Sequence, residues 1–324
     1  MKNKKTCVIL LNMGGPSSLD DVQPFLYNLF MDPDIIDIPL GRFIRPFIAK
    51  KISTKRALNV RTYYEKIGGG SPLLRLTMEQ AGELEKALAG EGDYKVLVAM
   101  RYWHPFTEET VKKVLLENPD NILLLPLYPQ YSSTTTGSSL NEFYRVWKKA
   151  GRRDVEISEV KEWHREEAYI DSWARTIMES LGGSSGKEWH ILFSAHGIPQ
   201  KLVDKGDPYQ AQTEETVRMI LNRLDWKGPW SISYQSRVGP VKWLEPATDL
   251  WMKELAEKGT RNLLMVPISF VSDHSETLYE MDILYKDLAA DAGIESFMRA
   301  PSLNSREIFI GALKNIVLKN CRVI

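Results

Sequence analysis

A histidine stands at the end of an apolar run in the stretch 191–200, which reads ILFSAHGIPQ. The apolar residues stop before His196, and Gly197 and Pro199 then turn the chain. Side chains at the carboxyl ends of parallel strands line ligand sites, and imidazole has an unperturbed pKa close to neutrality. His196 is therefore a candidate for proton transfer or metal binding, although a lone histidine can also be a structural residue.

A row of acidic residues follows a second apolar run, in the segment 268–282, ISFVSDHSETLYEMD. Asp273, Glu276 and Glu280 are spaced i, i+3 and i+7, so on a helix they share one face. Acids near a helix N-terminus also complement the helix dipole, but here apolar residues such as Phe270 and Tyr279 are interleaved with them. Carboxylates in apolar surroundings have raised pKa values and can bind a hard cation or relay protons.

Two further loops are candidates for anion binding. The segment 128–143, YPQYSSTTTGSSLNEF, is rich in hydroxyl donors, and an ordinary polar loop is the alternative. The segment 67–80, IGGGSPLLRLTMEQ, lacks the Gly-Lys-Ser/Thr of a phosphate loop, so Ser71 and Pro72 are predicted to start a helix. No strand is followed by G-x-G-x-x-G, which disfavours dinucleotide binding.

The elements that must position these residues alternate between strands and helices. The apolar runs lack strict alternation, as in strands buried on both faces. The pattern predicts an α/β protein with doubly wound parallel sheets. The expected strands are Val8–Leu11, Lys95–Ala99, Ile122–Leu125, Ile191–Phe193, Ile232–Tyr234 and Leu263–Val266, and the expected helices include Thr77–Ala89, Glu108–Glu117, Asp207–Arg223, Ala247–Lys258 and Asp282–Ala292.

A faint internal repeat indicates two similar Rossmann-like domains. LLNMGGP at 10–16 resembles FSAHGIP at 193–199 with an offset of 183, and NILLLP at 121–126 resembles NLLMVP at 262–267 with an offset of 141. Met13 is thereby equivalent to His196. The predicted domains are 1–155 and 156–300, with extra length at about 17–80 in the first.

The extra segment is unusually apolar. Residues 24–50 read PFLYNLFMDPDIIDIPLGRFIRPFIAK, with Arg42 and Arg45 among the large apolar side chains. One interpretation is a helical excursion packed on the core. The other is an apolar lip at 24–48 that covers a large flat ligand or touches a membrane surface.

Composition narrows the class of protein. The chain has 324 residues, long enough for two domains, and 42 basic against 42 acidic residues, so bulk charge does not favour nucleic acid. Two cysteines, Cys7 and Cys321, without a CxxC pair are typical of a reducing, cytoplasmic setting. No apolar run is long enough for a transmembrane helix, and the N-terminal MKNKKTCVILLNMGGP is interpreted as the first buried strand rather than a signal peptide.

Taken together, the motifs resemble those of the ferrochelatases, which insert ferrous iron into a porphyrin to make haem. The resemblance covers nearly the whole chain. It rests on LLNMGGP, IGGGSPLLRLT, RYWHPFTEE, LYPQYSSTTTGSSLNEFYR, LFSAHGIP, KGDPYQAQ, YQSRVGPVKWLEPATD and VPISFVSDHSETLYEMDI, in this order. It implies a cleft for protoporphyrin IX between the two domains, a C-terminal helix at 301–324 that packs back across them, Fe²⁺ as a substrate and no permanently bound cofactor.

The resemblance also implies roles for individual residues. His196 and Glu276 would be the catalytic and metal-contacting pair, and Asp273, His274 and Glu280 would form an acidic path for protons or metal. Met13 would face the other side of the porphyrin. The remaining expected substrate-binding residues are Arg56, Tyr64, Ser71, Arg101, Tyr102, Tyr128 and Trp243.

Two departures refine this expectation. The animal enzymes ligate an iron–sulfur cluster through a cysteine in the YS-C-STTGSS loop and three near the C-terminus; here that loop position is Ser133 and the tail holds only Cys321. Four thiolates are needed, so no cluster is expected. The coproporphyrin-using branch carries tyrosine where this chain has Met13, which favours protoporphyrin IX.

The predicted reaction is the insertion of Fe²⁺ into protoporphyrin IX with release of two protons, and His196 and Glu276 suit both proton transfer and iron contact. Which of the two does which stays open at this point. The alternatives are a chelatase for another metal or tetrapyrrole, such as cobalt or coproporphyrin III, and a porphyrin carrier without catalysis. The expected location is the cytoplasm, with peripheral membrane contact through 24–48.

Overall fold

The computed structural model describes residues 4–35, 41–152, 154–183, 188–237 and 239–321. The chain divides into two units, Met1–Trp163 with Ile310–Ile324, and His164–Phe309. The first division lies a little beyond the predicted boundary at 155. Helix α11 (Glu307–Cys321) begins in the second unit and continues in the first.

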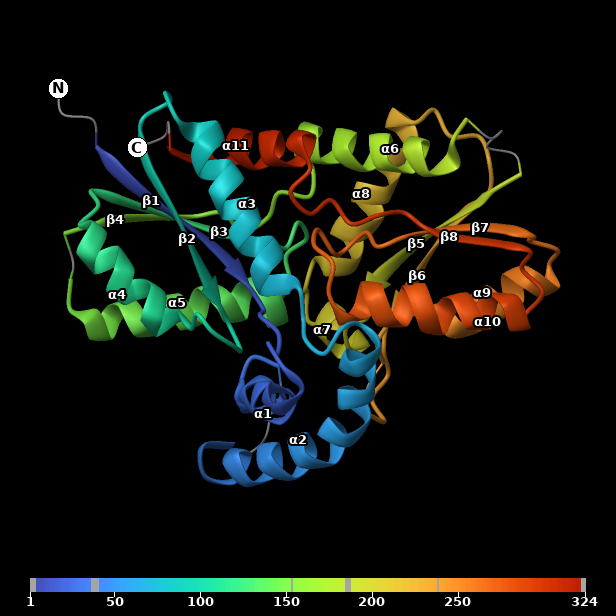
Figure 1. Ribbon diagram of the computed structural model, residues 1–324, viewed down its shortest axis with the longest axis horizontal. Coiled ribbons are helices and arrows are strands. Elements are labelled where there is room, and N and C mark those ends of the chain that lie inside the picture. Colours follow the sequence, from blue (N-terminus) through green and yellow to red (C-terminus); the bar gives the residue numbers. More distant parts are fainter. Residues whose placement is uncertain (1–3, 36–40, 153, 184–187, 238, 322–324) are drawn as a thin grey trace. The chain divides into compact units, whose positions relative to one another are not determined.

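A parallel sheet of four strands forms the centre of the first unit (Figure 1). The strand order is β2-β1-β3-β4, and each neighbouring pair is parallel. Every residue of β1 after Lys5 is buried, as in a strand covered on both faces. The strands are β1 (Lys5–Asn12), β2 (Asp93–Met100), β3 (Asn121–Pro126) and β4 (Glu156–Glu159).

The second unit repeats this sheet. Its order is β6-β5-β7-β8, again parallel throughout. The strands are β5 (His190–His196), β6 (Trp230–Gln235), β7 (Asn262–Val266) and β8 (Ser296–Arg299). The predicted fold class is thus confirmed, and all six predicted runs are strands.

Matching hydrogen bonds support the duplication that the sequence repeat indicates. The Leu127 N–H donates to the Leu11 carbonyl at 2.9 Å, and at the offset positions the Ile268 N–H donates to the Ser194 carbonyl at 3.1 Å. In each unit the bond joins the segment that follows the third strand, β3 or β7, to the neighbouring strand, β1 or β5. The same main-chain path therefore leads into the hydroxyl-rich loop of one unit and the acidic loop of the other.

Helices cover both faces of the first sheet. Alternate β1 residues, including Ile9 and Leu11, pack with Phe143 and Trp147 on the face covered by α4 and α5. Helix α3 contacts β1 and β2 on the other face (Figure 1). Bounds are α3 (Leu73–Leu88), α4 (Thr107–Glu117), the π-helix η2 (Ser133–Gly137) and α5 (Ser138–Ala150).

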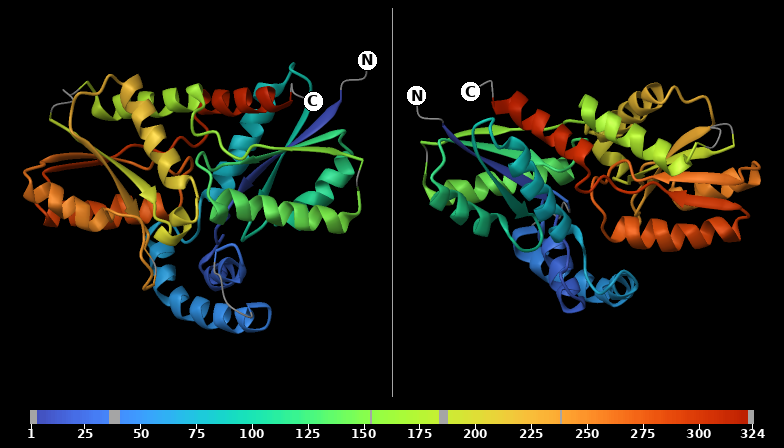
Figure 2. Two further views of the ribbon diagram at one scale, coloured as in Figure 1. Left: turned by 180° about the vertical axis from the view of Figure 1, so that it is seen from behind. Right: turned by 45° about the horizontal axis from the view of Figure 1, so that its top comes forward.

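The second sheet is covered in the same manner. Leu192, Leu263 and Met265 pack with residues of α9, η3 and α10 on one face. Helices α6 and α8 contact each other and lie on the opposite side of the strands (Figure 2, left). Bounds are α6 (Glu167–Leu181), α7 (Gln200–Asp204), α8 (Tyr209–Arg223), α9 (Thr248–Glu257), the π-helix η3 (Glu276–Tyr285) and α10 (Lys286–Asp291).

The extra length of the first unit lies between β1 and α3, where it forms η1 (Leu19–Asp21), α1 (Val22–Met31) and α2 (Gly41–Lys66). Helix α1 buries Phe25, Leu26 and Phe30, which pack against α2. In contrast, Phe43 is 81% exposed and Phe47 is 74% exposed on α2. Half of the apolar segment is therefore packed and half faces outward. Residues 36–40 and the Arg42 side chain lie outside the described part of the chain.

Among the described helices, none is both long and apolar enough to cross a membrane.

Candidate active site

His196 is the last residue of β5 and is held there by its main chain. Its N–H donates to Ser269 Oγ at 3.3 Å, and its carbonyl accepts the Tyr209 hydroxyl at 2.9 Å. The next residue must be glycine, because a Cβ on Gly197 would lie 2.7 Å from the carbonyl oxygen of Gln235 in β6. The turn that the sequence predicted thus fixes the imidazole at the carboxyl edge of the sheet, with 37% of the side chain exposed.

Glu276 and Glu280 lie four residues apart in η3, the helix that follows β7. A π-helix closes i→i+5 hydrogen bonds and so contains more residues per turn than an α-helix. Residues four apart still lie on one side of such a helix, whereas the i, i+7 alignment of an α-helix is lost. Asp273 also precedes the helix, which begins at Glu276. The predicted single face of three carboxylates is therefore reduced to the pair Glu276 and Glu280.

The imidazole and the first carboxylate of this pair form a dyad. His196 Nδ1 lies 2.9 Å from Glu276 Oε2. The other ring nitrogen, Nε2, has no hydrogen-bond partner among the residues that the structure describes. A second imidazole, His274 Nε2, lies 3.9 Å from Glu276 Oε1, and its ring packs on Phe270 with centroids 4.5 Å apart.

The second carboxylate is joined to the dyad by two polar residues at the end of β6. Ser236 Oγ lies 2.9 Å from Glu276 Oε2 and 2.8 Å from Glu280 Oε2. Gln235 Nε2 donates to Glu280 Oε2 at 3.1 Å, and Ser194 Oγ donates to the Gln235 side chain at 2.7 Å. Sequence reasoning missed Gln235 and Ser236, although the rule that strand carboxyl ends line the site applies to β6 as well as to β5.

Burial and charge move the pKa values of these groups apart. Burial alone would lower the pKa of His196, but the Glu276 carboxylate raises it above its ordinary value. Burial opposes ionisation of Glu276 as well, yet the charge and hydrogen bond of His196 lower the pKa of Glu276 to about 2. Burial and the neighbouring Glu276 charge raise the pKa of Glu280 to about 7. The site therefore combines an imidazole whose protonation the adjacent carboxylate favours with a carboxyl that holds a proton near neutrality.

Asp273 is occupied by a different network. Burial alone would raise the pKa of Asp273. The charge of Arg299 and hydrogen bonds from three side chains outweigh this effect and lower the pKa below its ordinary value; the three are Asn304, Ser302 and Thr277. Arg299 Nη1 lies 3.0 Å from Asp273 Oδ1, and the three other side chains donate at 2.8–2.9 Å. Its oxygens are thus engaged by β8, by the loop that follows β8 and by Thr277 of η3.

Trp243 lies next to Gly197, the residue after His196, whereas the other substrate-binding candidates belong to the first unit. A Cβ on Gly197 would be 3.5 Å from the Trp243 ring. In the first unit, Met13 packs on the apolar cluster that contains Tyr64 and Tyr102. The Ser71 N–H donates to the Pro16 carbonyl at 2.8 Å, which joins the 67–80 loop to the chain after β1.

The predicted start of helix α3 was one residue early: Leu73 is the first helical residue, and Pro72 rather than Ser71 occupies the N-cap position. Ser71 Oγ nevertheless accepts the Leu73 N–H at 3.3 Å. Arg56 lies over the Phe30 ring, 5.7 Å from its centroid. Burial raises the pKa of Tyr128 above its ordinary value.

Arg101 and Tyr102 converge on a buried carboxylate that sequence reasoning missed. The Tyr102 hydroxyl donates to Asp32 Oδ2 at 2.7 Å, and Arg101 Nη2 lies 3.1 Å from the same oxygen. Ser138 also donates to Asp32. Asp32 follows α1 directly, so this network attaches the extra segment to the loop after β2 and to the start of α5.

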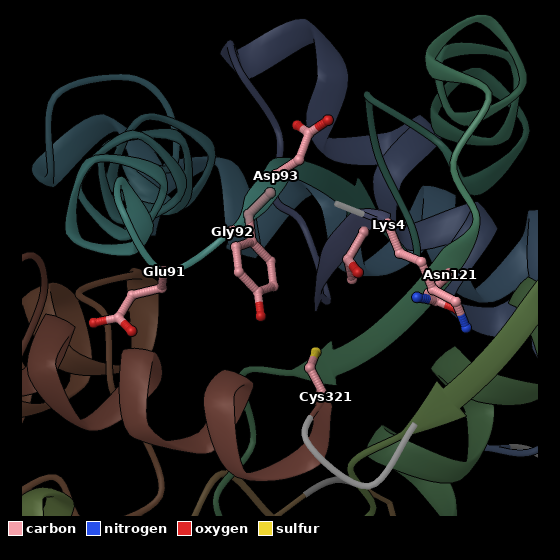
Figure 3. A pocket seen from close by; sticks show the side chains of 8 residues that line it. Lys4, Glu91, Gly92, Asp93, Asn121 and Cys321 are labelled. Atoms are coloured by element: carbon pink, nitrogen blue, oxygen red, sulfur yellow. The ribbon is translucent and has the colours of Figure 1, made fainter. Parts of the chain in front are cut away.

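A hollow of about 200 Å³ lies elsewhere in the first unit (Figure 3). Its walls include Thr6, Asp93 and Asn121, which are at the amino ends of their strands, and Cys321. This edge is opposite to the one at which sheets of this kind bind ligands. In the part of the chain that the structure describes, no group of three or more His, Cys, Asp or Glu side chains is arranged to hold a metal ion.

The duplicated parallel sheet resembles that of several solved structures. Among solved structures, SirB from Bacillus subtilis with Fe3+ has a TM-score of 0.60 and 12% identity, covering 98% of this chain and 95% of that chain. CbiX, described as the terminal enzyme for biosynthesis of siroheme in denitrifying bacteria, has a TM-score of 0.51 and 12% identity, with 97% and 99% coverage. These likenesses concern the fold.

The family follows from sequence. Residues 5–321 match the model of the ferrochelatase family. The ferrochelatase of Aquifex aeolicus is 47% identical over 313 residues, covering 97% of this chain and 98% of that one. The ferrochelatase of Gloeobacter violaceus is 48% identical over 320 residues, with 98% of both chains covered. The chain belongs to the ferrochelatase family, whose members are lyases that insert ferrous iron into a porphyrin in haem synthesis.

Proposed function

We propose that the chain metallates protoporphyrin IX with His196 as the base and Glu276 as the group that orients it. Two pyrrole N–H protons must leave as Fe²⁺ enters the ring. The observation that carries the proposal is the 2.9 Å contact between His196 Nδ1 and Glu276 Oε2. A proton on Nδ1 then points at the carboxylate, so the lone pair of Nε2 is free to accept a pyrrole proton.

The carboxylate stabilises the imidazolium that forms. Glu276 Oε2 already accepts from His196 and lies beside Ser236, whereas Oε1 makes no hydrogen bond to the described residues and lies 3.9 Å from His274 Nε2. We therefore assign Oε1 as the oxygen that contacts the incoming Fe²⁺. Carboxylate oxygen and imidazole nitrogen are both suitable ligands for this ion.

Protoporphyrin IX is the proposed porphyrin because of Met13. Within the family that the sequence resembles, the coproporphyrin-using branch has tyrosine where this chain has Met13. In this chain the thioether packs on an apolar cluster and its main-chain carbonyl accepts the Tyr102 N–H at 2.9 Å. An apolar group here favours the porphyrin with fewer carboxylates.

The proposed reaction needs no iron–sulfur cluster. A cluster is held by four protein ligands, usually thiolates, and the chain has only Cys7 and Cys321. Cys7 is buried inside β1, and Cys321 ends α11. Nucleic acid is not a proposed partner, because basic and acidic residues balance.

Peripheral contact with a membrane surface is proposed for the start of α2. Phe43 and Phe47 are one helical turn apart and exposed, and Lys50 and Lys51 follow on the exposed surface. Exposed aromatic and basic side chains on one helix favour binding to the interface of an anionic bilayer. The proposed place of action is accordingly the cytoplasm next to such a surface.

His196→Ala tests the assignment. The folded variant should still bind protoporphyrin IX, since apolar contact at about 25 cal/mol per Å² supplies most of the affinity. Its anaerobic metallation rate with saturating Fe²⁺ should fall by roughly 10²-fold or more, the scale for loss of a positioned base. His104→Ala is the matched control, because this side chain is 58% exposed and its Nδ1 pairs with Glu109 on the surface. Near-native turnover in His196→Ala protein would remove His196 from the mechanism.

A further inference from the structure

Two side-chain hydroxyls and the main chain of His196 form a closed ring of hydrogen bonds. The His196 N–H donates to Ser269 Oγ at 3.3 Å, and the Tyr209 hydroxyl donates to the His196 carbonyl at 2.9 Å. Tyr209 Oη lies 2.7 Å from Ser269 Oγ. Because the single proton of the Tyr209 hydroxyl is directed at the carbonyl, Ser269 is the donor in this third bond. The ring therefore begins and ends at the main chain of one residue.

The ring lies where the sheet offers His196 no neighbouring strand. Strand β7 pairs with β5 only as far as Phe193, so His196 lies beyond the paired part. Tyr209 is the first residue of α8, and Ser269 lies between β7 and η3. Their hydroxyls supply the donor and the acceptor that the main chain of a longer β7 would supply. Ser269 also belongs to the segment that leads to Glu276, so the ring joins the two elements that carry the dyad.

The first unit shows that the fold itself does not require this ring. Met13 occupies the position equivalent to His196, and its carbonyl accepts the main-chain N–H of Tyr102 at 2.9 Å. The Met13 N–H donates to the Asn12 side chain at 2.8 Å. The main-chain groups of Met13 are thus satisfied without a hydroxyl. The ring occurs at the strand end that carries the imidazole and not at the one that carries the thioether.

We propose that Tyr209 and Ser269 are positioning residues that hold His196 at its distance from Glu276 during metallation. This role rests on the proposed function of His196 as the base. Chain segments with few main-chain partners open readily, and the ring gives both polar main-chain groups of His196 a partner. Tyr209 is only 5% exposed, so water does not replace its hydroxyl easily. No proton is transferred along the ring, and both residues act through the position of the imidazole.

Tyr209→Phe and Ser269→Ala test this role, because each removes one hydroxyl and keeps the remaining side chain. A misplacement of about 1 Å can lower a rate by roughly 10²-fold, and loss of one of two anchors should lower kcat by about 10-fold. The KM for protoporphyrin IX should stay unchanged, since neither hydroxyl is among the expected substrate-binding groups. The double variant should be close to the slower single variant, because either change already opens the ring.

Amide hydrogen exchange at His196, followed by NMR, gives a readout that does not depend on turnover. The His196 N–H should exchange about 10-fold faster in each variant, because its acceptor is absent or no longer fixed. Tyr169→Phe is the matched control. Its hydroxyl is equally buried in the same unit and donates to a main-chain carbonyl, that of Ile268, at 3.2 Å. Its kcat and its His196 exchange rate should be native.

Native kcat in both Tyr209→Phe and Ser269→Ala would overturn the positioning role, as would an unchanged exchange rate at His196. An equal loss of kcat in Tyr169→Phe would also overturn it, because any buried hydroxyl would then have the same effect. These outcomes are separate from failure of the proposed function. If His196→Ala retains native turnover, the base assignment fails; if His196→Ala is inactive and the two hydroxyl variants are native, only the positioning role fails.

Discussion

His196 Nδ1 and Glu276 Oε2 lie 2.9 Å apart although 80 residues separate them in the chain. The contact joins the end of β5 to the start of η3, within one unit of the fold. It sets the tautomer of the imidazole and the charge of both groups. The acid–base properties of the site therefore depend on where β5 ends and where η3 begins.

Glu276→Gln should lower the pKa of His196. Burial is the largest influence on this pKa and lowers it, and the Glu276 charge reverses that effect. Without the charge, the pKa should fall below the ordinary value near 6.5. Titration of the imidazole resonances by NMR measures the shift. Glu109→Gln, which alters a surface carboxylate beside His104, should leave the His196 titration as it was; an unchanged pKa in Glu276→Gln would contradict the dyad.

Glu280→Gln should become more stable relative to the native chain as pH rises. The folded-state pKa of Glu280 is raised to about 7 from 4.5. The native carboxyl therefore contributes stability that is fully present below pH 4.5 and is lost as pH rises through 7. Glutamine does not ionise, so the difference between the two chains should grow by about 1–3 kcal/mol between pH 5 and pH 8.

Urea unfolding at several pH values measures this difference. In a Glu276→Gln background the pH dependence should be smaller, because the Glu276 charge is one cause of the raised pKa. A stability difference that stays constant from pH 5 to pH 8 would mean that Glu280 ionises normally in the folded protein.

Arg299→Met should destabilise the fold strongly. The guanidinium lies 3.0 Å from Asp273 and 2.7 Å from Asp282, and its side chain is only 10% exposed. Removal of the guanidinium leaves the buried Asp273 carboxylate with neutral donors and no counter-charge, at a cost of about 3–5 kcal/mol. Arg75→Met is the matched control, since its pair with Glu79 is exposed and should contribute about 0.5 kcal/mol or less. Equal unfolding free energies for the two variants would show that Asp273 does not depend on Arg299.

The central strands could be predicted from sequence, and the edge strands could not. Short apolar runs such as Ile122–Leu125, separated by amphipathic stretches, are typical of strands covered on both faces. In contrast, β4 (Glu156–Glu159) and β8 (Ser296–Arg299) are short and only partly buried. Their sequences therefore show little hydrophobic pattern. These two segments adopt the strand conformation because they pair with β3 and β7.

Only part of the candidate site could be predicted from sequence, because the rest depends on the folded main chain. The motif gave His196 and Glu276, but the α-helical spacing rule placed Asp273 in the same row. The wider turn of η3 depends on the main-chain hydrogen bonds of the folded loop, which residue types do not specify. Ser236 was missed because serine is common in loops and acquires its role only through its distances to two carboxylates.

Phe43→Ser with Phe47→Ser should weaken binding to vesicles that contain anionic lipid. The two rings are exposed at the start of α2, and their removal takes away apolar area that a bilayer interface would bury. Co-sedimentation with vesicles measures the loss, and metallation of soluble porphyrin should be preserved. Leu116→Ser, which changes an 86% exposed residue on α4, is the control. Equal sedimentation of all three proteins would argue against the proposed contact.

The purified protein should show no iron–sulfur absorption in the visible range and no acid-labile sulfide. The reason is that Cys7 and Cys321 supply two thiolates and a cluster takes four ligands. Stoichiometric sulfide together with a visible band would contradict this.

Gly197 makes the site sensitive to substitution although this residue has no functional group of its own. A methyl at this position would meet the Gln235 carbonyl oxygen at 2.7 Å, and that atom belongs to the strand end that leads directly to Ser236. The two strand ends would have to separate, and the imidazole would move away from the hydroxyl and both carboxylates. An inactive natural variant of this chain can therefore retain every ionisable residue of its site, and inspection of those residues alone would misclassify it as functional.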